Sequence, residues 1–147
     1  MNTREMAESL CRFVGLATCL TVFASRSLGD PTVLTWNDAA GINLWDAASL
    51  TWLDSGIASV AWQAGAEGHF TGSGGTVQLA ADVTANNLAF TGTGYLLQGT
   101  NTLTLDGSAT SADGTANTIA ANLLSSGGIT KSGTGTLTLT APSAGFG

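Results

Sequence analysis

A run of glycine, lysine and serine near the end of the chain has the residue types of a phosphate-binding loop. It spans residues 128–140 and contains Lys131. A Walker-type loop has a first glycine, then four residues of any type, then Gly-Lys followed directly by Ser or Thr. A helix begins immediately after it. Here Gly133 and Gly135 come after the lysine, and residues 136–140 alternate threonine with leucine. The spacing predicts a strand, a turn and a second strand, and no nucleotide site.

The acidic and imidazole side chains could carry catalysis only if they met in pairs. His69 is the only histidine in the chain, and no cysteine follows residue 19 to complete a zinc site. Asp38, Asp46 and Asp54 recur every eight residues, and paired carboxylates can hydrolyse glycosidic bonds. Their neighbours are typical of turns, so we interpret them as turn caps and His69 as a loop residue. The sequence predicts no enzyme, no catalytic residue, no cofactor and no metal site.

The tryptophans offer the one binding chemistry with a physical basis. All four lie between residues 31 and 75, and exposed indole faces can stack on sugar rings. They could form a carbohydrate platform, or they could plug one open end of a β-stack as a cap, which is the interpretation we favour. The candidate residues are Trp36, Trp45, Trp52 and Trp62.

The rest of the chain must position these groups on strands, because apolar residues recur at period two from residue 76 onward. The inward pairs include Val77 with Leu79, and Leu103 with Leu105. The pattern slips by one at residues 86–87, both asparagine, which predicts a corner or a bulge; Asn117 could serve similarly.

Residues 94–105 and 128–139 also match each other, since both end in Thr-Leu-Thr-Leu after a Gly-Thr pair, and they lie 34 positions apart. We therefore expect an all-β fold, a short right-handed parallel β-helix or β-solenoid of stacked repeats, with a β-sandwich as the alternative.

The charge pattern limits the partners. The chain has 147 residues, a net charge of −6 and only 10% charged residues. Nucleic-acid binding needs a basic face, so an acidic chain argues against it. The low charge also leaves strand edges with little protection against association.

The first 24 residues differ from the remainder. Arg4 and Arg12 precede a short apolar run that ends in Val22-Phe23-Ala24, as in a helical signal peptide. The run is too short to span a membrane, and we expect no span in the mature chain. We divide the chain into a signal peptide at 1–24, cut as late as residue 29, a Trp-rich capping segment at 31–75, β-strand repeats at 76–140 and a tail at 141–147.

The last repeat resembles the autotransporter-associated β-strand repeat of bacterial surface proteins. That repeat has a glycine, an apolar residue, a lysine, two glycines and two leucines at fixed spacing. The matching residues are Gly128, Ile129, Lys131, Gly133, Gly135, Leu137 and Leu139. The resemblance implies an exported, non-enzymatic segment with a structural or adhesive role at the cell surface, whose partners are surface glycans or further β-repeats. A carbohydrate-binding module is the alternative function. The chain departs from the family because it carries few repeats, and its length leads us to expect no C-terminal barrel of membrane strands.

Overall fold

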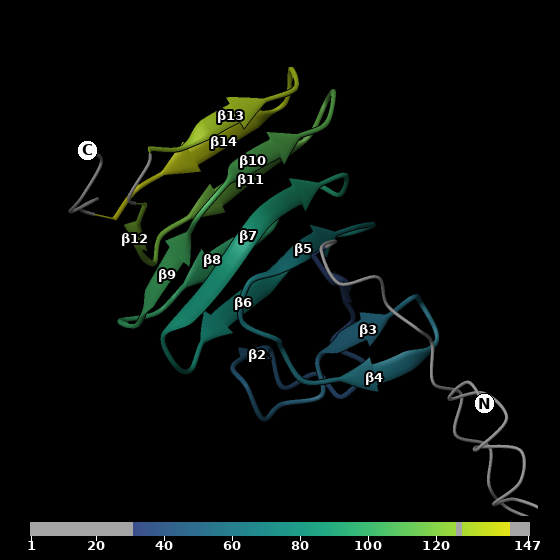
Figure 1. The fold of residues 1–147 in the computed structure, drawn as a ribbon. Helices are drawn as coiled ribbons and strands as arrows, with labels where there is room; N and C mark the ends of the chain where they lie inside the picture. The colour runs from purple at the N-terminus through teal and green to yellow at the C-terminus, as the bar shows by residue number, and fades with distance from the viewer. Residues whose placement is uncertain (1–30, 126–127, 142–147) are drawn as a thin grey trace, which may run out of the picture. The chain divides into compact units, whose positions relative to one another are not determined.

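The computed structural model describes residues 31–125 and 128–141, and every regular element among them is a β-strand. Figure 1 shows the strands stacked from β3 and β4 at one end to β13 and β14 at the other. The strands are β1 Val33–Trp36, β2 Leu44–Trp45, β3 Trp52–Asp54, β4 Ala58–Val60, β5 Ala66–Phe70, β6 Thr76–Leu79, β7 Val83–Phe90, β8 Leu96–Gln98, β9 Thr102–Leu105, β10 Ser108–Ser111, β11 Ala116–Ile119, β12 Asn122–Leu124, β13 Thr130–Ser132 and β14 Thr136–Leu139.

The strands wind into a β-solenoid of about 4 turns, so the predicted fold class is confirmed. One sheet has nine strands and the other has five, in the order β14-β11-β8-β6-β2. Neighbours in the smaller sheet are all parallel and one turn apart: Val77 lies beside Leu97, and Leu97 beside Ile119. These partners are separated by 20 and 22 positions, which is the length of the later turns. Leu44 of β2 pairs with Gln78 of β6 34 positions on, because the first turn also contains the β3–β4 hairpin. A β-sandwich would instead be built from antiparallel neighbours.

The two segments that match each other 34 positions apart do not occupy equivalent places in the stack. Their Thr-Leu-Thr-Leu endings form β9 in the larger sheet and β14 in the smaller one. They look alike because any strand with one dry face and one wet face can use this alternation. The local prediction for residues 128–140 is confirmed, since β13, a turn and β14 follow one another.

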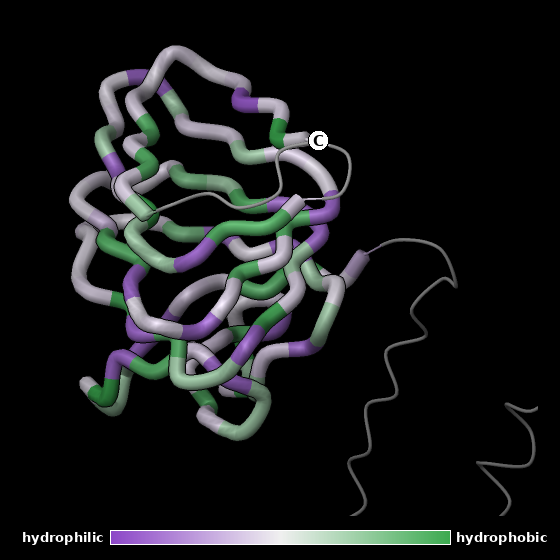
Figure 2. The backbone as a smooth tube through the Cα atoms, turned by 90° about the vertical axis from the view of Figure 1, so that its left-hand side faces the viewer, coloured by the Kyte–Doolittle hydropathy of each residue, from purple (hydrophilic) through white to green (hydrophobic). Residues whose placement is uncertain are grey.

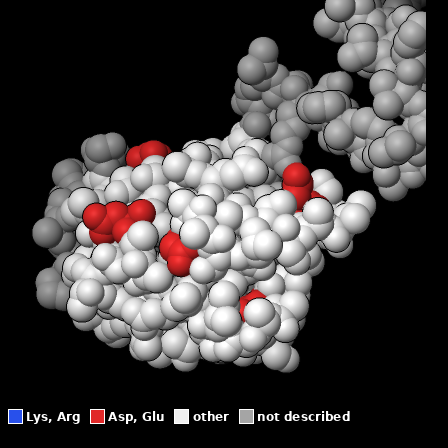
Figure 3. Space-filling view, turned by 90° about the horizontal axis from the view of Figure 1, so that it is seen from below, with Lys and Arg blue, Asp and Glu red and all other residues white. Residues whose placement is uncertain are grey.

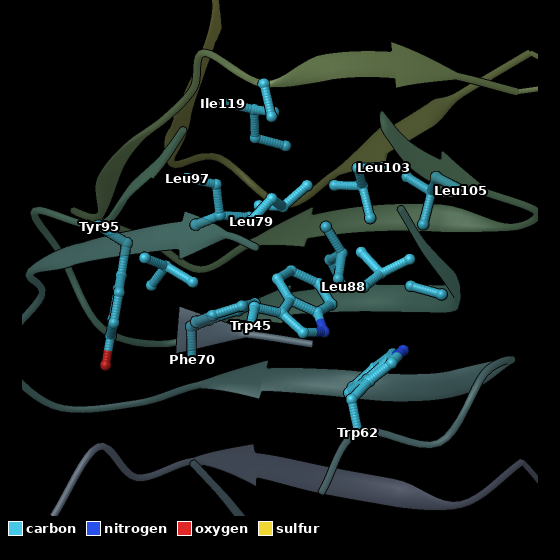
Figure 4. Close-up of a cluster of buried hydrophobic side chains, with 14 of the residues drawn as sticks. Trp45, Trp62, Phe70, Leu79, Leu88, Tyr95, Leu97, Leu103, Leu105 and Ile119 are labelled. Carbon is cyan, nitrogen blue, oxygen red and sulfur yellow. The ribbon is translucent and has the colours of Figure 1, made fainter. Parts of the chain in front are cut away.

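The core lies between the sheets and is filled by alternate side chains of each strand. Figure 2 shows hydrophobic positions recurring between hydrophilic ones along the stacked turns. Leu97, Leu103, Leu105 and Ile119 are fully or almost fully buried, as the period-two pattern predicts. Figure 4 shows these side chains filling the space between the strands together with aromatic rings. Burying side chains of this size stabilises the fold by about 1.5–3 kcal/mol each.

Asparagine side chains join successive turns. The parallel pairing of β5 with β7 changes register between Ala66 and Gly68, opposite Asn86 and Asn87, so the predicted bulge is confirmed. The amide of Asn87 donates to Glu67 Oε1 at 2.7 Å, and its Oδ1 accepts from the Ser108 N–H of the next turn at 2.7 Å. One side chain therefore connects three turns.

Asn117 does not turn a corner, contrary to its sequence-based interpretation. It lies within β11, is buried, and points toward a corner of the preceding turn. Its amide donates to the Gly92 carbonyl at 3.0 Å, and its Oδ1 accepts from the Tyr95 N–H at 2.9 Å. Both partners would otherwise be buried without a hydrogen bond, at a cost of about 1–3 kcal/mol each.

The signal peptide predicted at 1–24 lies outside the described residues, as does all of the predicted tail except Ala141. No helix long and apolar enough to span a membrane occurs in the part of the chain that the structure describes.

Candidate functional site

Three of the four tryptophans form an aromatic cluster inside one end of the solenoid. Trp45 and Trp52 are 0% exposed and Trp62 is 4% exposed. The ring centroids of Trp52 lie 5.1 Å from Trp45, 4.6 Å from Trp62 and 5.5 Å from Phe70. Buried rings offer no face to a sugar, so a platform of all four tryptophans does not form. The side chains fill the first turn, as the cap interpretation requires.

The segment that carries Trp52 also changes the pairing of the strands. β3 runs antiparallel to β1, with Trp52 directly opposite Trp36, and β4 folds back antiparallel to β3. Ser55 and Gly56 both have positive φ values, of 52° and 71°, as a tight hairpin turn demands. The parallel ladder of the larger sheet thus ends in a short antiparallel hairpin at this end.

Two of the three regularly spaced aspartates, Asp38 and Asp46, accept hydrogen bonds from backbone N–H groups of the turns that follow them, as turn caps do. Asp46 accepts hydrogen bonds from the N–H groups of Ala48 and Ser49 at 2.7 and 2.6 Å. Partial burial raises the pKa of Asp46, but these bonds and one from the Ser49 hydroxyl outweigh it, and the pKa lies below its ordinary value. Asp54 is the last residue of β3, and its carboxylate accepts from the Ser55 hydroxyl at 3.1 Å.

His69 lies on β5, where a loop was predicted, and its Nε2 is 3.7 Å from Glu67 Oε2. The described residues contain no group of three or more His, Cys, Asp or Glu side chains that could hold a metal ion.

A polar groove of about 530 Å³ lies beside the fourth tryptophan. Trp36 is only partly buried, and its ring packs edge-on against Trp52 at 5.2 Å. Asp38 lines the same groove. Its carboxylate accepts hydrogen bonds from the backbone N–H groups of Ile42 at 2.9 Å and Asn43 at 2.7 Å. The first turn also supplies Asn37, Ala39, Gly41 and Asn43. The next two turns supply the rest of the lining, namely Thr71, Ser73, Gly74, Gly75, Thr76 and Tyr95.

Tyr95 closes one side of this groove. Its ring is buried against Phe70 at 5.2 Å, and its hydroxyl donates to the Thr71 carbonyl at 2.5 Å. Burial raises the pKa of the Tyr95 hydroxyl, so it remains a donor. Sequence reasoning missed Asp38 and Tyr95 as groove residues. The signal was a repeat of Phe-Thr-Gly-x-Gly at residues 70–74 and 90–94, which marks stacked corners.

The residues that resemble the autotransporter repeat build the last described turn. Gly133, with φ of 76°, and Gly135 pack onto the backbone of residues 111–112 in the turn below, where a Cβ would overlap carbonyl oxygens. Lys131 is exposed on β13 and donates to the Gly133 carbonyl at 2.5 Å. Gly128 has a positive φ of 78°. Among the apolar residues of the motif, Ile129 and Leu137 are partly buried against the core, and Leu139 is exposed.

Fold and site together define an all-β solenoid with an aromatic plug at one end. Comparison with protein-family models, curated proteins and solved structures finds no match for the chain.

Proposed function

We propose that the chain is a non-enzymatic structural segment of an exported bacterial surface protein, similar to autotransporter-associated β-repeat passengers. Its role is to begin a β-solenoid and to present an edge on which further turns stack. The observation that carries the proposal is the difference between the two ends of the stack. The motif resemblance of residues 128–139 supports the surface location and the export.

The end that holds the tryptophans is closed. The aromatic cluster fills the interior there, and the β3–β4 hairpin covers the last parallel strand of the larger sheet. Solenoids need special residues at their ends, because the last turn would otherwise expose its interior to water.

The opposite end is open within the described residues. There β12, β13 and β14 each pair with a strand of the turn below and with no strand above. Leu139 is 43% exposed, although it pairs with Ile119, which is 1% exposed, and so occupies an inward-facing position of the solenoid. Parallel strands with unpaired N–H and C=O groups and an uncovered inward-facing leucine fit one partner well, which is another turn of the same kind.

The proposal predicts that added turns stabilise the protein. Two copies of residues 120–139 inserted directly after Leu139 continue the observed 20-residue register of β11 with β14. We expect the melting temperature to rise by at least about 5 °C, because each new turn buries apolar surface. Association of the chain, followed by light scattering, should fall.

A control insert uses the same 40 residues in scrambled order. If the ordered insert leaves the melting temperature unchanged and is digested by protease as fast as the scrambled one, the edge does not accept further turns and the proposal fails.

A further inference from the structure

The groove beside Trp36 has the size of a small-ligand site. Its volume of about 530 Å³ falls within the ~300–1,000 Å³ of such sites. It is formed by corners of three successive turns, which the ladder holds in register: the backbone N–H of Gly74 donates to Thr93 O at 2.8 Å. The walls are therefore preformed.

The groove contains one rigid aromatic side chain at its wall. Trp36 is fixed by Trp52 and lies 6.2 Å from Phe70, so ordering its indole on binding costs little entropy. It is also the one tryptophan of the four that is not buried. An aromatic ring beside hydrogen-bonding groups matches the alternating C–H faces and hydroxyls of a sugar.

Polar groups that could form hydrogen bonds with sugar hydroxyls line the groove around the Trp36 ring. Asp38 Oδ2 accepts from the backbone N–H of Asn43 and, in the amide orientation that satisfies its neighbours, from the Asn43 side chain at 3.1 Å. Oδ1 accepts one backbone hydrogen bond, from Ile42, which leaves a lone pair for a further donor. The side chains of Asn37, Ser73 and Thr76 line the groove, and no hydrogen bond within the described residues occupies them.

The charge around the groove selects the class of ligand. Lys131, on β13, is the one Lys or Arg among residues 31–125 and 128–141. The face of the molecule in Figure 3 carries separate acidic side chains and neither Lys nor Arg. An anionic sugar would meet Asp38 without a compensating base. A quaternary amine would need several exposed aromatic faces, whereas the Tyr95 ring in the groove wall is buried and Trp36 is the less buried of the two aromatic residues that line the groove.

We propose that the Trp36 groove binds a short neutral glycan, with the sugar face on the indole and its hydroxyls on Asp38 and Asn37. This goes beyond the structural role, which does not depend on it. A surface protein with such a site adheres to neutral polysaccharide.

The test is a titration of the full chain with neutral disaccharides, namely cellobiose, maltose, mannobiose and N,N′-diacetylchitobiose, and with digalacturonate. We expect at least one neutral sugar to bind and to shield tryptophan emission from acrylamide quenching, with digalacturonate binding at least about tenfold more weakly. Trp36→Ala should lower the affinity at least about tenfold, and Trp36→Tyr should restore part of it, because stacking needs a ring. Asn37→Ala should lower it to a smaller degree.

The matched control is Ile57→Ala. Ile57 is 87% exposed on the β3–β4 hairpin turn and does not line the groove, so this variant should bind like the unaltered chain. The inference is overturned if none of the neutral sugars binds at millimolar concentration, or if folded Trp36→Ala, checked by its melting temperature, binds as tightly as the unaltered chain.

Discussion

Replacing Gly92 with alanine is expected to destabilise the solenoid by about 3 kcal/mol or to prevent folding. Gly92 lies in a corner that stacks directly on the corner of the preceding turn. An added Cβ would overlap the carbonyl oxygen of Gly72 and lie only 2.9 Å from its nitrogen. These atoms belong to backbone held in the ladder, so they cannot move aside as a flexible side chain would, and overpacking commonly costs about 1–3 kcal/mol or more. Urea unfolding measures the loss.

Gly75→Ala is the matched control in the neighbouring corner. A Cβ there meets no atom within 4 Å, and Gly75 does not need a positive φ. The substitution should leave the stability within about 1 kcal/mol of the unaltered chain, since only the freedom of the unfolded chain changes. Equal losses for the two variants would show that the corners do not stack as described.

Replacing Trp52 with alanine is expected to cost about 3–5 kcal/mol, which is the range for large aromatic side chains removed from a core. Trp52 is fully buried and contacts the rings of Trp36, Trp45 and Trp62, so its loss opens a cavity in the centre of the plug. Because native proteins typically have about 5–15 kcal/mol of stability, the variant should unfold at much lower denaturant concentration.

Two further variants test whether the loss of stability depends on the central position of Trp52 in the aromatic cluster or follows from the loss of any aromatic ring. Trp36→Ala should cost less, because Trp36 already faces the groove and water. Trp52→Phe should cost less than Trp52→Ala, since it retains a ring and removes a buried indole N–H that has no hydrogen-bond partner among the described residues. If Trp36→Ala destabilises the protein more than Trp52→Ala, the plug is not centred on Trp52.

Much of the fold follows from local pattern. The alternation of Val77 with Leu79 and of Leu103 with Leu105 identifies the buried face of each strand, and burial confirms all four. The slip at residues 86–87 locates the bulge in β7. These features depend only on which side chains avoid water, and that information is present in short segments of sequence.

The length of a turn could not be found in the same way. Thr-Leu-Thr-Leu suits a strand in either sheet, so its recurrence after 34 residues does not indicate equivalent places in the stack. The corners carry that information, because close stacking of Gly92 on Gly72 excludes a Cβ. The paired Phe70 and Phe90, whose rings stack at 4.9 Å, mark the same 20-residue interval.

The tryptophans illustrate a second limit. Residue type alone shows that the four indoles are costly to expose, but not which of them faces the interior. That outcome depends on the hairpin, which places Trp52 inside and leaves Trp36 beside the groove. The groove itself joins residues from three turns, among them Asp38, Ser73 and Tyr95, and no local motif connects them.

Residue-resolved hydrogen exchange on dilute, monomeric protein tests most directly whether the solenoid is closed at the tryptophan end and open at the other. We expect the strongest protection in β5 and β7, which pair on both sides and pack on the aromatic cluster, and the weakest in β13 and β14. The pattern follows from pairing, since the amides of β14 meet a strand on one side only. Protection of β14 equal to that of β7 in the monomer would contradict the open edge, and with it the proposal that further turns stack there.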